Sequence, residues 1–309
     1  MQETFTVALW NAREFHADAD LTREASHRKM KWLMQRLEAE RPDACFVLEM
    51  MGGHEAFTAK LNGLRARAQK AGYLVRWLVG EGGSGREQRQ GDDTYTNGIA
   101  VLVNQATCVL ERHVRIEERV LGTWLRGRGV KAQVSARVAA IHGLHHEGTS
   151  SFRQQLQAVR DWADDNSLGS LGCLVVGDFN YVASVDWRSS HVALSHNDTC
   201  FKNFILQPGT EYIQPLADQS LIVWTRKGGE TDEVGTSDGF GSMLDGAVAT
   251  GREYGHWRRV CVEFAFELGT SASGALCKPL SDHAWLVFSR RVPTLELRGK
   301  KDLFPHYLG

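Results

Sequence analysis

Asp178 and Asn180 are the two residues whose types and spacing most directly suggest chemistry. They follow segment 173–177, which reads Cys-Leu-Val-Val-Gly and predicts a short buried strand. Residues two apart in an extended segment face the same side, so a carboxylate and a carboxamide would point together from the end of a sheet. An Asx turn that closes the strand is the simpler interpretation of the pair taken alone. Similar positions elsewhere in the chain favour the functional interpretation.

Polar side chains occupy comparable positions beside other apolar, strand-like segments. These residues are Asn11, Glu49, Asp245, Asp282 and His283. A charged group pressed against an apolar strand is costly unless it is paired or bound to a metal. If the fold gathers these strand ends on one side, their side chains form a single acidic pocket.

Such a pocket predicts a particular kind of metal chemistry. Oxygen ligands favour a hard cation, Mg²⁺ or Mn²⁺, over Zn²⁺. The sequence has no HExxH motif and no zinc-finger spacing, which agrees with this choice. A hard cation held by one or two carboxylates keeps positions open for a phosphate oxygen and water. Asp178 and Asn180 would then orient the attacking water, and a His–Asp pair would stabilise charge on the phosphate.

The elements that must position these residues are many strands and a few helices. Apolar alternation and short apolar runs predict strands at 4–10, 45–48, 73–79, 98–103, 107–118, 130–141, 173–177, 220–225, 243–248, 260–268 and 284–288. Helical spacing of apolar residues predicts helices within 30–37, 57–68, 152–162 and 199–206. This mixture predicts an α/β (α+β) fold, a four-layer sandwich of two packed mixed sheets flanked by helices. We expect one catalytic domain over 1–290 and a C-terminal tail over 291–309.

Composition sets broad limits on the partners of the chain. The 309 residues contain 36 Lys and Arg against 37 Asp and Glu, for a net charge of −1, so no overall field indicates nucleic acid or membrane. A local basic face remains compatible with this sum. The six cysteines form no CxxC pair, and neither a signal peptide nor a membrane span is visible. These features predict a reduced, intracellular protein that does not bind membranes.

Five short motifs occur in an order that resembles the endonuclease/exonuclease/phosphatase superfamily. They are WNAR at 10–13, VLE at 47–49, GDFN at 177–180, SMLD at 242–245 and SDH at 281–283. The resemblance runs from about residue 4 to 290. This superfamily includes pancreatic-type deoxyribonucleases, apurinic endonucleases, non-LTR retrotransposon endonucleases, neutral sphingomyelinases and inositol polyphosphate 5-phosphatases. The resemblance therefore implies a divalent-metal-dependent phosphodiester hydrolase.

The resemblance also implies a metal site, although the sequence departs from the family pattern at two positions near it. It makes Glu49 the principal ligand of Mg²⁺ or Mn²⁺, with Asn11 beside it and Asp282 close, directly or through water. Leu48 stands where a glutamine usually precedes the catalytic glutamate, so one supporting hydrogen bond is missing. Arg13 replaces an aspartate of the apurinic-type enzymes.

For catalysis, the resemblance implies that Asp178 activates or orients the nucleophilic water. Asn180 would contact the phosphate or that water, and Asn11 would assist. His283 would contact the scissile phosphate and be oriented by Asp245. His142 falls where family members carry a His or Tyr that contacts the phosphate or helps the leaving group. A histidine satisfied within the sheet is the alternative for His142.

Several features favour DNA as the substrate. Trp224 and Arg226 lie in a segment that resembles one of retroelement and apurinic enzymes, and an aromatic beside a basic group suits an unstacked base and its phosphate. Basic residues recur in predicted loops: Arg126, Arg128, Lys131, Arg252, Arg258, Arg259, Lys300 and Lys301. Solvated faces and a core role for Trp224 are the alternative interpretations.

We therefore expect a Mg²⁺-dependent endonuclease that acts on DNA in preference to RNA. The neutral net charge and His142 leave two alternatives open. One is a phosphodiesterase or phosphatase for a lipid head group or a small soluble phosphoester. The other is a catalytically inactive nucleic-acid-binding relative. The sequence carries no signal for the oligomeric state.

Overall fold

The computed structural model describes the greater part of the chain in separate ranges. These are 3–16, 24–52, 63–78, 96–144, 149–165, 172–184, 193–213, 226–228, 240–242, 245–266 and 279–292. Within them, only the backbone is described for 13–16, 24–27, 51–52, 78, 96–97, 149–151, 226–228, 240–242, 262–266 and 279–282.

Two mixed β-sheets form the centre of the molecule. Among the described residues, the first sheet has eight strands. In spatial order these are β11 (Phe240–Ser242), β10 (Arg226–Gly228), β14 (Pro279–Arg291), β1 (Thr4–His16), β2 (Ala44–Gly52), β4 (Thr96–Asn104) and β3 (Tyr73–Leu78), with β13 (Trp257–Phe266) paired to β14. The second has six: β5 (Cys108–Glu117), β6 (Val120–Gly127), β7 (Ser135–His142), β8 (Leu174–Asp178), β12 (Asp245–Thr250) and β9 (Thr210–Tyr212). β1–β2 and β7–β8 pair in parallel, and the other pairs are antiparallel.

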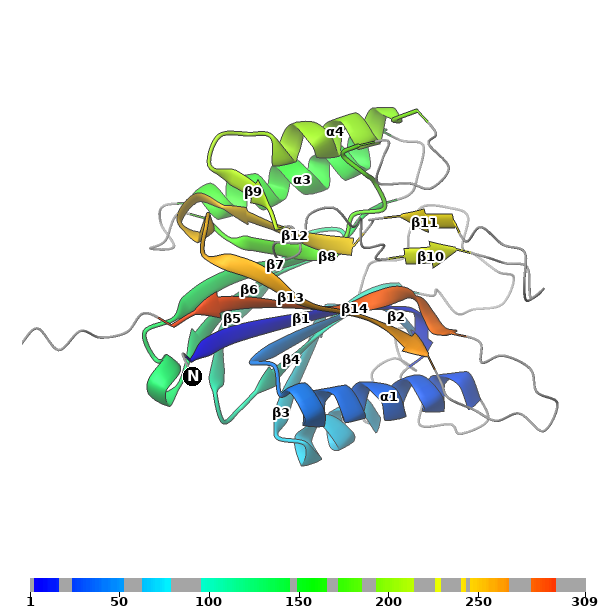
Figure 1. Ribbon diagram of the computed structural model, residues 1–309, viewed down its shortest axis with the longest axis vertical. Coiled ribbons are helices and arrows are strands. Elements are labelled where there is room, and N and C mark those ends of the chain that lie inside the picture. Colours follow the sequence, from blue (N-terminus) through cyan, green and yellow to red (C-terminus); the bar gives the residue numbers. More distant parts are fainter. Residues whose placement is uncertain are drawn as a thin grey trace, which may run out of the picture.

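Helices cover the outer faces of both sheets. α1 (Glu24–Glu40) lies on the first sheet, whereas α3 (Thr149–Asp164) and α4 (His196–Ile205) lie together on the second (Figure 1). Residues 63–70 form a further helical segment, and η1 (Gly129–Lys131) and η4 (Gly251–Glu253) are single 3₁₀ turns. The layers are thus helix, sheet, sheet and helix. This confirms the predicted four-layer sandwich. No helix in the described ranges has the length and apolar character needed to cross a membrane.

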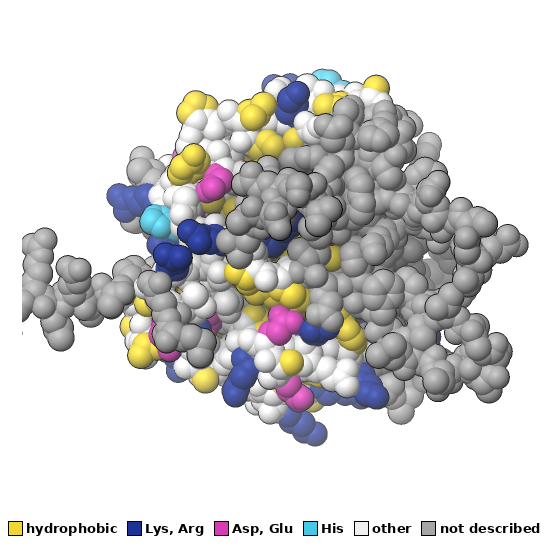
Figure 2. All heavy atoms as spheres, viewed as in Figure 1, with side chains coloured by type: hydrophobic (Ala, Val, Ile, Leu, Met, Phe, Trp, Pro, Cys, Tyr) yellow, Lys and Arg dark blue, Asp and Glu magenta, His cyan; other side chains and the backbone are white. Residues whose placement is uncertain are grey.

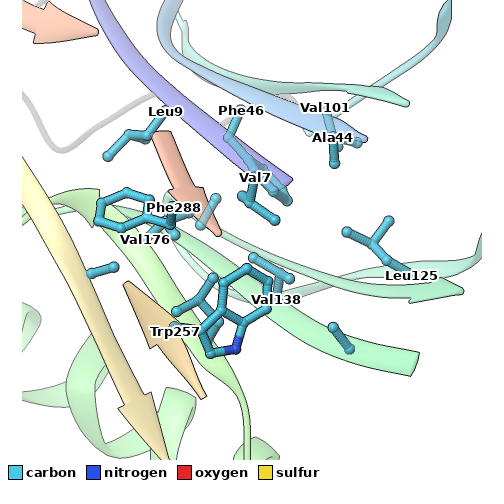
Figure 3. Close-up of a cluster of buried hydrophobic side chains, with 14 of the residues drawn as sticks. Val7, Leu9, Ala44, Phe46, Val101, Leu125, Val138, Val176, Trp257 and Phe288 are labelled. Atoms are coloured by element: carbon cyan, nitrogen blue, oxygen red, sulfur yellow. The ribbon is translucent and has the colours of Figure 1, made fainter. Parts of the chain in front are cut away.

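The main core lies between the two sheets and follows strand alternation. Val7 and Leu9 of β1 point into this space with Phe46 of β2, and they meet Val138 and Val176 of the second sheet (Figure 3). The intervening residues of β1 point the other way, towards α1. The residues that continue these inward-facing rows along each strand therefore also lie between the two sheets.

One buried ion pair joins the two sheets away from the polar strand ends. Asp43, which precedes β2, accepts hydrogen bonds from the Thr6 backbone N–H (2.7 Å) and from Lys131 Nζ (2.8 and 2.9 Å). The Asp43 side chain is fully buried. Lys131 was predicted to belong to a basic loop that faces nucleic acid. That interpretation is wrong, because its ammonium group is committed to Asp43.

Arg259 likewise differs from its expected surface position. Trp257 and Arg259 are buried on β13, whereas Arg258 and Val260 between and after them are exposed, as alternation in a strand requires. Within the described part of the chain, the Arg259 guanidinium has no hydrogen-bond partner. Burial lowers the pKa of Arg259, an effect that nearby Tyr212 opposes. Arg259 is therefore an interior residue and not part of a basic loop.

Other element predictions were incomplete. Strand β6 was not predicted, and β7 begins at Ser135 because Gly129–Lys131 turns as η1. The predicted strand at 220–225 lies outside the described residues. The boundary between a catalytic domain and a tail stays a prediction, since residues 293–309 are also outside them. β14 runs to Arg291, and Val292 is buried just beyond it.

Candidate active site

Six strands bring polar side chains to one region between the sheets. β1, β2 and β14 of the first sheet carry Asn11, Glu49 and His283, and β7, β8 and β12 of the second carry His142, Asp178 and Asp245. Asp178 is the register partner of His142 in the parallel β7–β8 ladder and of Asp245 in the antiparallel β8–β12 ladder. The second sheet thus sets these three side chains in a row.

Asn11 links the two sheets through a pair of carboxylates. Its Nδ2 donates to Glu49 Oε1 (3.0 Å) and to Asp178 Oδ2 (2.8 Å). Asn11 and Asp178 are buried, and the Glu49 side chain is 17% exposed. One amide group therefore holds two acidic side chains that come from different sheets.

His283 forms a hydrogen-bonded pair with Asp245. Its Nδ1 lies 2.8 and 3.0 Å from the two Asp245 carboxylate oxygens and 3.7 Å from Asp178 Oδ2. An ionised carboxylate only accepts hydrogen bonds, so Nδ1 carries a proton in this pair. Both residues are buried. Asp245 consequently fixes the tautomer and the orientation of the His283 ring.

The group Glu49, Asp178 and His283 has the dimensions of a metal site. One potential ligand atom from each lies within 4.8 Å of the others. Two carboxylates held this close and partly desolvated repel each other unless a cation lies nearby. The His283 Nδ1 donates to Asp245, so the two carboxylates are the part of this group suited to a hard cation. The donor set therefore fits Mg²⁺ or Mn²⁺.

A backbone irregularity points Glu49 into this site. Leu48 faces the core between the sheets, and Val47 faces α1. Strict alternation would direct Glu49 towards α1 as well. The β2–β4 register shifts between Val47 and Met50, and Glu49 has a φ of 55°. A left-handed conformation costs a residue other than glycine about 1–3 kcal/mol, so the rest of the fold must hold this bulge in place.

Asn180 is also held in a left-handed conformation, with a φ of 59°. Asparagine tolerates this region better than most residues. Its backbone N–H donates to Asp178 Oδ1 (2.9 Å), and its Nδ2 donates to the Gly143 carbonyl (2.6 Å). These bonds fix both the turn after β8 and the direction of the amide group.

His142 lies beside Asp178 in the second sheet, on the side opposite Asp245. It is buried, and its Nε2 is 3.5 Å from Glu49 Oε1. The structure therefore brings together seven of the residues singled out in the sequence: Asn11, Glu49, His142, Asp178, Asn180, Asp245 and His283. For Asp282 and Arg226 only the backbone is described; Arg226 is the register partner of His283. Trp224 lies outside the described residues.

The residues that support the site by hydrogen bonds to the segments that carry it were not identified from the sequence. Gln155 of α3, Tyr181, and Asn197 of α4 are buried and bond the segments that carry His142 and Asn180. The Ser195-x-x-Asp198 pattern is a helix-start signal that could have placed α4. Nothing in the sequence indicated that α4 contacts the site.

A groove of about 380 Å³ between α3 and α4 is separate from this site. Arg153 and Arg160 line it together with amide and apolar side chains, and none of its lining residues is a carboxylate. It therefore lacks the carboxylate ligands that a hard cation prefers, whereas the region between the sheets has them.

Comparison with known proteins identifies the family. The model of the Endonuclease/Exonuclease/phosphatase family matches residues 8–283, so the chain belongs to this family of phosphoester hydrolases. The match includes every residue of the site, from Asn11 to His283. No curated protein sequence matches the chain.

Solved structures share the fold at low sequence identity. The human Nocturnin catalytic domain with bound sulfate has a TM-score of 0.60 and 16% identity, over 94% of each chain. D. rerio TDP2 complexed with a single-strand DNA product has a TM-score of 0.57 and 15% identity, over 93% of this chain and 98% of that one. The 3′ phosphatase NExo from Neisseria, bound to a product DNA hairpin, has a TM-score of 0.60 and 16% identity, over 93% and 99%. At these identities the likeness is one of fold.

Proposed function

We propose that the protein is a divalent-metal-dependent phosphodiesterase, an endonuclease that hydrolyses DNA by attack of water. The observation that carries this proposal is the arrangement around Asn11, whose amide joins Glu49 to Asp178. The His283–Asp245 pair lies beside it, 3.7 Å from Asp178. A carboxylate for water, carboxylates for a cation and an oriented imidazole are the parts that phosphodiester hydrolysis needs.

Glu49, Asn11 and Asp282 are the residues proposed to hold Mg²⁺, or Mn²⁺ in its place. A bound divalent ion would polarise a phosphate oxygen and offset the charge that develops on it. The Glu49 side chain is 17% exposed whereas Asn11 is buried, so the Glu49 carboxylate remains accessible from solvent. Asn11 keeps the Glu49 carboxylate turned towards Asp178.

Asp178 is proposed to orient and deprotonate the nucleophilic water. Its two oxygens accept from Asn11 Nδ2 and from the Asn180 backbone N–H, so the carboxylate cannot rotate freely. Asn180 Nδ2 is directed at the Gly143 carbonyl. The remaining polar atom of the Asn180 side chain is Oδ1, which can only accept a hydrogen bond. It can accept from a water molecule but not from a phosphate oxygen, which is itself an acceptor. We assign Asn180 to the water.

His283 and His142 are proposed to act on the phosphate and the leaving group. Asp245 supports a positive charge on the His283 imidazole, which would stabilise negative charge on the phosphate. His142, whose Nε2 is 3.5 Å from Glu49 Oε1, would contact the phosphate or the leaving oxygen.

DNA is the proposed substrate. The backbone of Arg226 is paired with that of His283. This pairing supports the proposal that Arg226 and the nearby Trp224 contact a phosphate and a base. Similar folds have been solved with DNA: D. rerio TDP2 with a single-strand product and Neisseria NExo with a product hairpin.

A small phosphoester is the second candidate, and the charge distribution favours it. On the face drawn in Figure 2, the described Lys and Arg side chains are interspersed with acidic and hydrophobic ones. Arg126 is paired with Glu111, and Lys131 with Asp43. Basic residues committed in this way contribute little to binding a long polyanion.

Nicking of supercoiled plasmid in Mg²⁺ tests the proposal. Wild-type protein should nick the plasmid, and EDTA, Asp178→Ala and His283→Ala should each abolish the activity. Arg153→Ala, in the separate groove, is the control that should retain it. Hydrolysis of a generic phosphodiester with intact plasmid would support the second candidate instead. DNA retention without cleavage of either substrate would indicate an inactive binding relative.

A further inference from the structure

Two chain segments that carry proposed catalytic residues are bonded directly to each other. We call them the His142 segment (142–144) and the Asp178 segment (178–182). The Gly143 N–H donates to the Asp178 carbonyl (2.7 Å), and Asn180 Nδ2 donates back to the Gly143 carbonyl (2.6 Å). A Cβ at residue 143 would lie 2.4 Å from the Phe179 carbonyl oxygen, so only glycine permits this approach. Their contact sets the position of His142 relative to Asp178.

Tyr181 joins both segments to the helical layer. Its hydroxyl donates to the Leu144 carbonyl (2.8 Å) and accepts from Asn197 Nδ2 of α4 (2.9 Å). Its ring packs on Phe152 of α3, with ring centroids 4.4 Å apart. Tyr181 is buried beside Asn180, so one hydroxyl connects the two segments and α4.

Asp198 fixes the same end of α4 to the Asp178 segment. It is the N3 residue of a capping box with Ser195, whose N–H and Oγ both lie 2.7 Å from Asp198 Oδ2. Its other oxygen, Oδ1, accepts from the Val182 N–H (2.8 Å). The side chain is fully buried. The first turn of α4 and the end of the Asp178 segment therefore form one bonded unit.

Gln155 of α3 holds the His142 segment in an equivalent way. Its Oε1 accepts from the Leu144 N–H (3.2 Å), and its Nε2 donates to the His142 carbonyl (3.3 Å) and the Glu118 carbonyl (2.7 Å). The His142 segment is thus bonded to α3, and the Asp178 segment is bonded to α4. The Tyr181 hydroxyl, which belongs to the Asp178 segment, bonds both the His142 segment and α4.

We propose that Tyr181 is a positioning residue of the hydrolase, which sets the placement of Asn180 and Asp178 relative to His142. Asn197 holds the Tyr181 hydroxyl in place from α4. The effect on catalysis rests on the proposed function. Supporting residues of this kind typically change activity by about 10- to 100-fold when their hydrogen bonds are removed.

Tyr181→Phe removes the hydroxyl and keeps the ring on Phe152. Tyr73→Phe is a matched control: the buried Tyr73 hydroxyl also bonds backbone carbonyls, those of Leu37 (3.3 Å) and Pro42 (3.0 Å), in the layer that contains α1. We expect both variants to lose similar thermal stability. Tyr181→Phe should lower kcat by about 10- to 100-fold with KM within about twofold, and Tyr73→Phe should keep both constants. Equal kcat values for the two variants would overturn the proposal.

Amide hydrogen exchange provides a readout that does not need activity. In Tyr181→Phe, peptides that cover 142–144 and 178–182 should exchange faster than in wild type, and in Tyr73→Phe they should not. If wild-type protein cleaves no phosphodiester, the proposed function fails, and the exchange result alone decides whether Tyr181 positions the segments. Unchanged exchange in both segments of Tyr181→Phe would refute it. Asn197→Ala should reproduce the exchange pattern and add little to Tyr181→Phe, because both changes break the same link.

Discussion

Asp178 and Asp245 are directly paired across the β8–β12 ladder, and both carboxylates are buried. His283 distinguishes them: its Nδ1 lies 2.8 Å from Asp245 but 3.7 Å from Asp178. Only the shorter distance is a hydrogen bond. Asp245 is therefore occupied with orienting the imidazole, and Asp178 keeps its capacity for a water molecule. The placement of a single ring thus gives two adjacent carboxylates different hydrogen-bond partners.

Asp245→Asn should lower kcat by about 10- to 100-fold with little change in KM, because an amide no longer enforces the Nδ1–H tautomer of His283. The measurement is steady-state hydrolysis of a phosphodiester in Mg²⁺. Asp43→Asn is the matched control, since it alters a buried carboxylate between the same sheets, away from the site. Similar kcat values for both variants would contradict the orienting role of Asp245.

Asn11→Asp should make the stability of the fold depend strongly on the divalent ion. The change replaces the amide that bridges Glu49 and Asp178 with a third carboxylate. Without its bridging donor, and with added repulsion, the free energy of unfolding in EDTA should fall by about 1–3 kcal/mol. Mg²⁺ at about 100 times its dissociation constant should return about 2.7 kcal/mol of stability.

Denaturant unfolding with and without Mg²⁺ measures this effect. Asn104→Asp is the control, because Asn104 is also buried and accepts a hydrogen bond from the Ala106 N–H outside the site. Because its metal site is unchanged, its stability should respond to Mg²⁺ as wild type does, and less than that of Asn11→Asp at the same Mg²⁺ concentration. A Mg²⁺ response of Asn11→Asp no larger than that of Asn104→Asp would argue against a cation beside Asn11.

Lys131→Met should destabilise the protein by about 3–5 kcal/mol, because it leaves the fully buried Asp43 carboxylate without its cation. Urea unfolding measures the loss. Adding Asp43→Asn to Lys131→Met should recover part of the stability, since the uncompensated charge is then removed. A double variant as unstable as the single one would show that lost packing, not charge, causes the effect.

Arg259→Met should raise stability by about 1–4 kcal/mol, because a buried guanidinium that lacks a hydrogen-bond partner in the described structure is replaced by an apolar side chain of similar length. The thermal midpoint is the measurement. Arg258→Met, at the exposed neighbouring position, should leave it nearly unchanged. A lowered midpoint for Arg259→Met would mean that the guanidinium contributes net stability.

The convergence of the site was predictable because it follows from strand ends. Apolar alternation placed Asn11, Asp178 and Asp245 beside buried strands, and the order of the motifs indicated a fold that gathers those ends. Hard-cation chemistry followed from the residue types. These predictions needed the period of a strand, the resemblance of the ordered motifs to a known family, and the preferences of oxygen ligands.

The direction of individual side chains was less predictable. Alternation places Glu49 against α1, and only the bulge between Val47 and Met50 turns it into the site. Lys131 and Arg259 look like surface charges in the sequence, yet one pairs with buried Asp43 and the other is interior to β13. Bulges and long-range partners depend on neighbouring strands that a local pattern cannot specify.

Because Asn11 belongs to one sheet and Asp178 to the other, the 2.8 Å bond between them exists only while the two sheets keep their mutual alignment. The hydrophobic side chains between the sheets, such as Leu9 and Val176, therefore set the distance between the polar groups that the two sheets carry. A small cavity in this core, at a residue that touches no reactive group, would shift the two sheets relative to each other. Activity would therefore fall before the fold is lost.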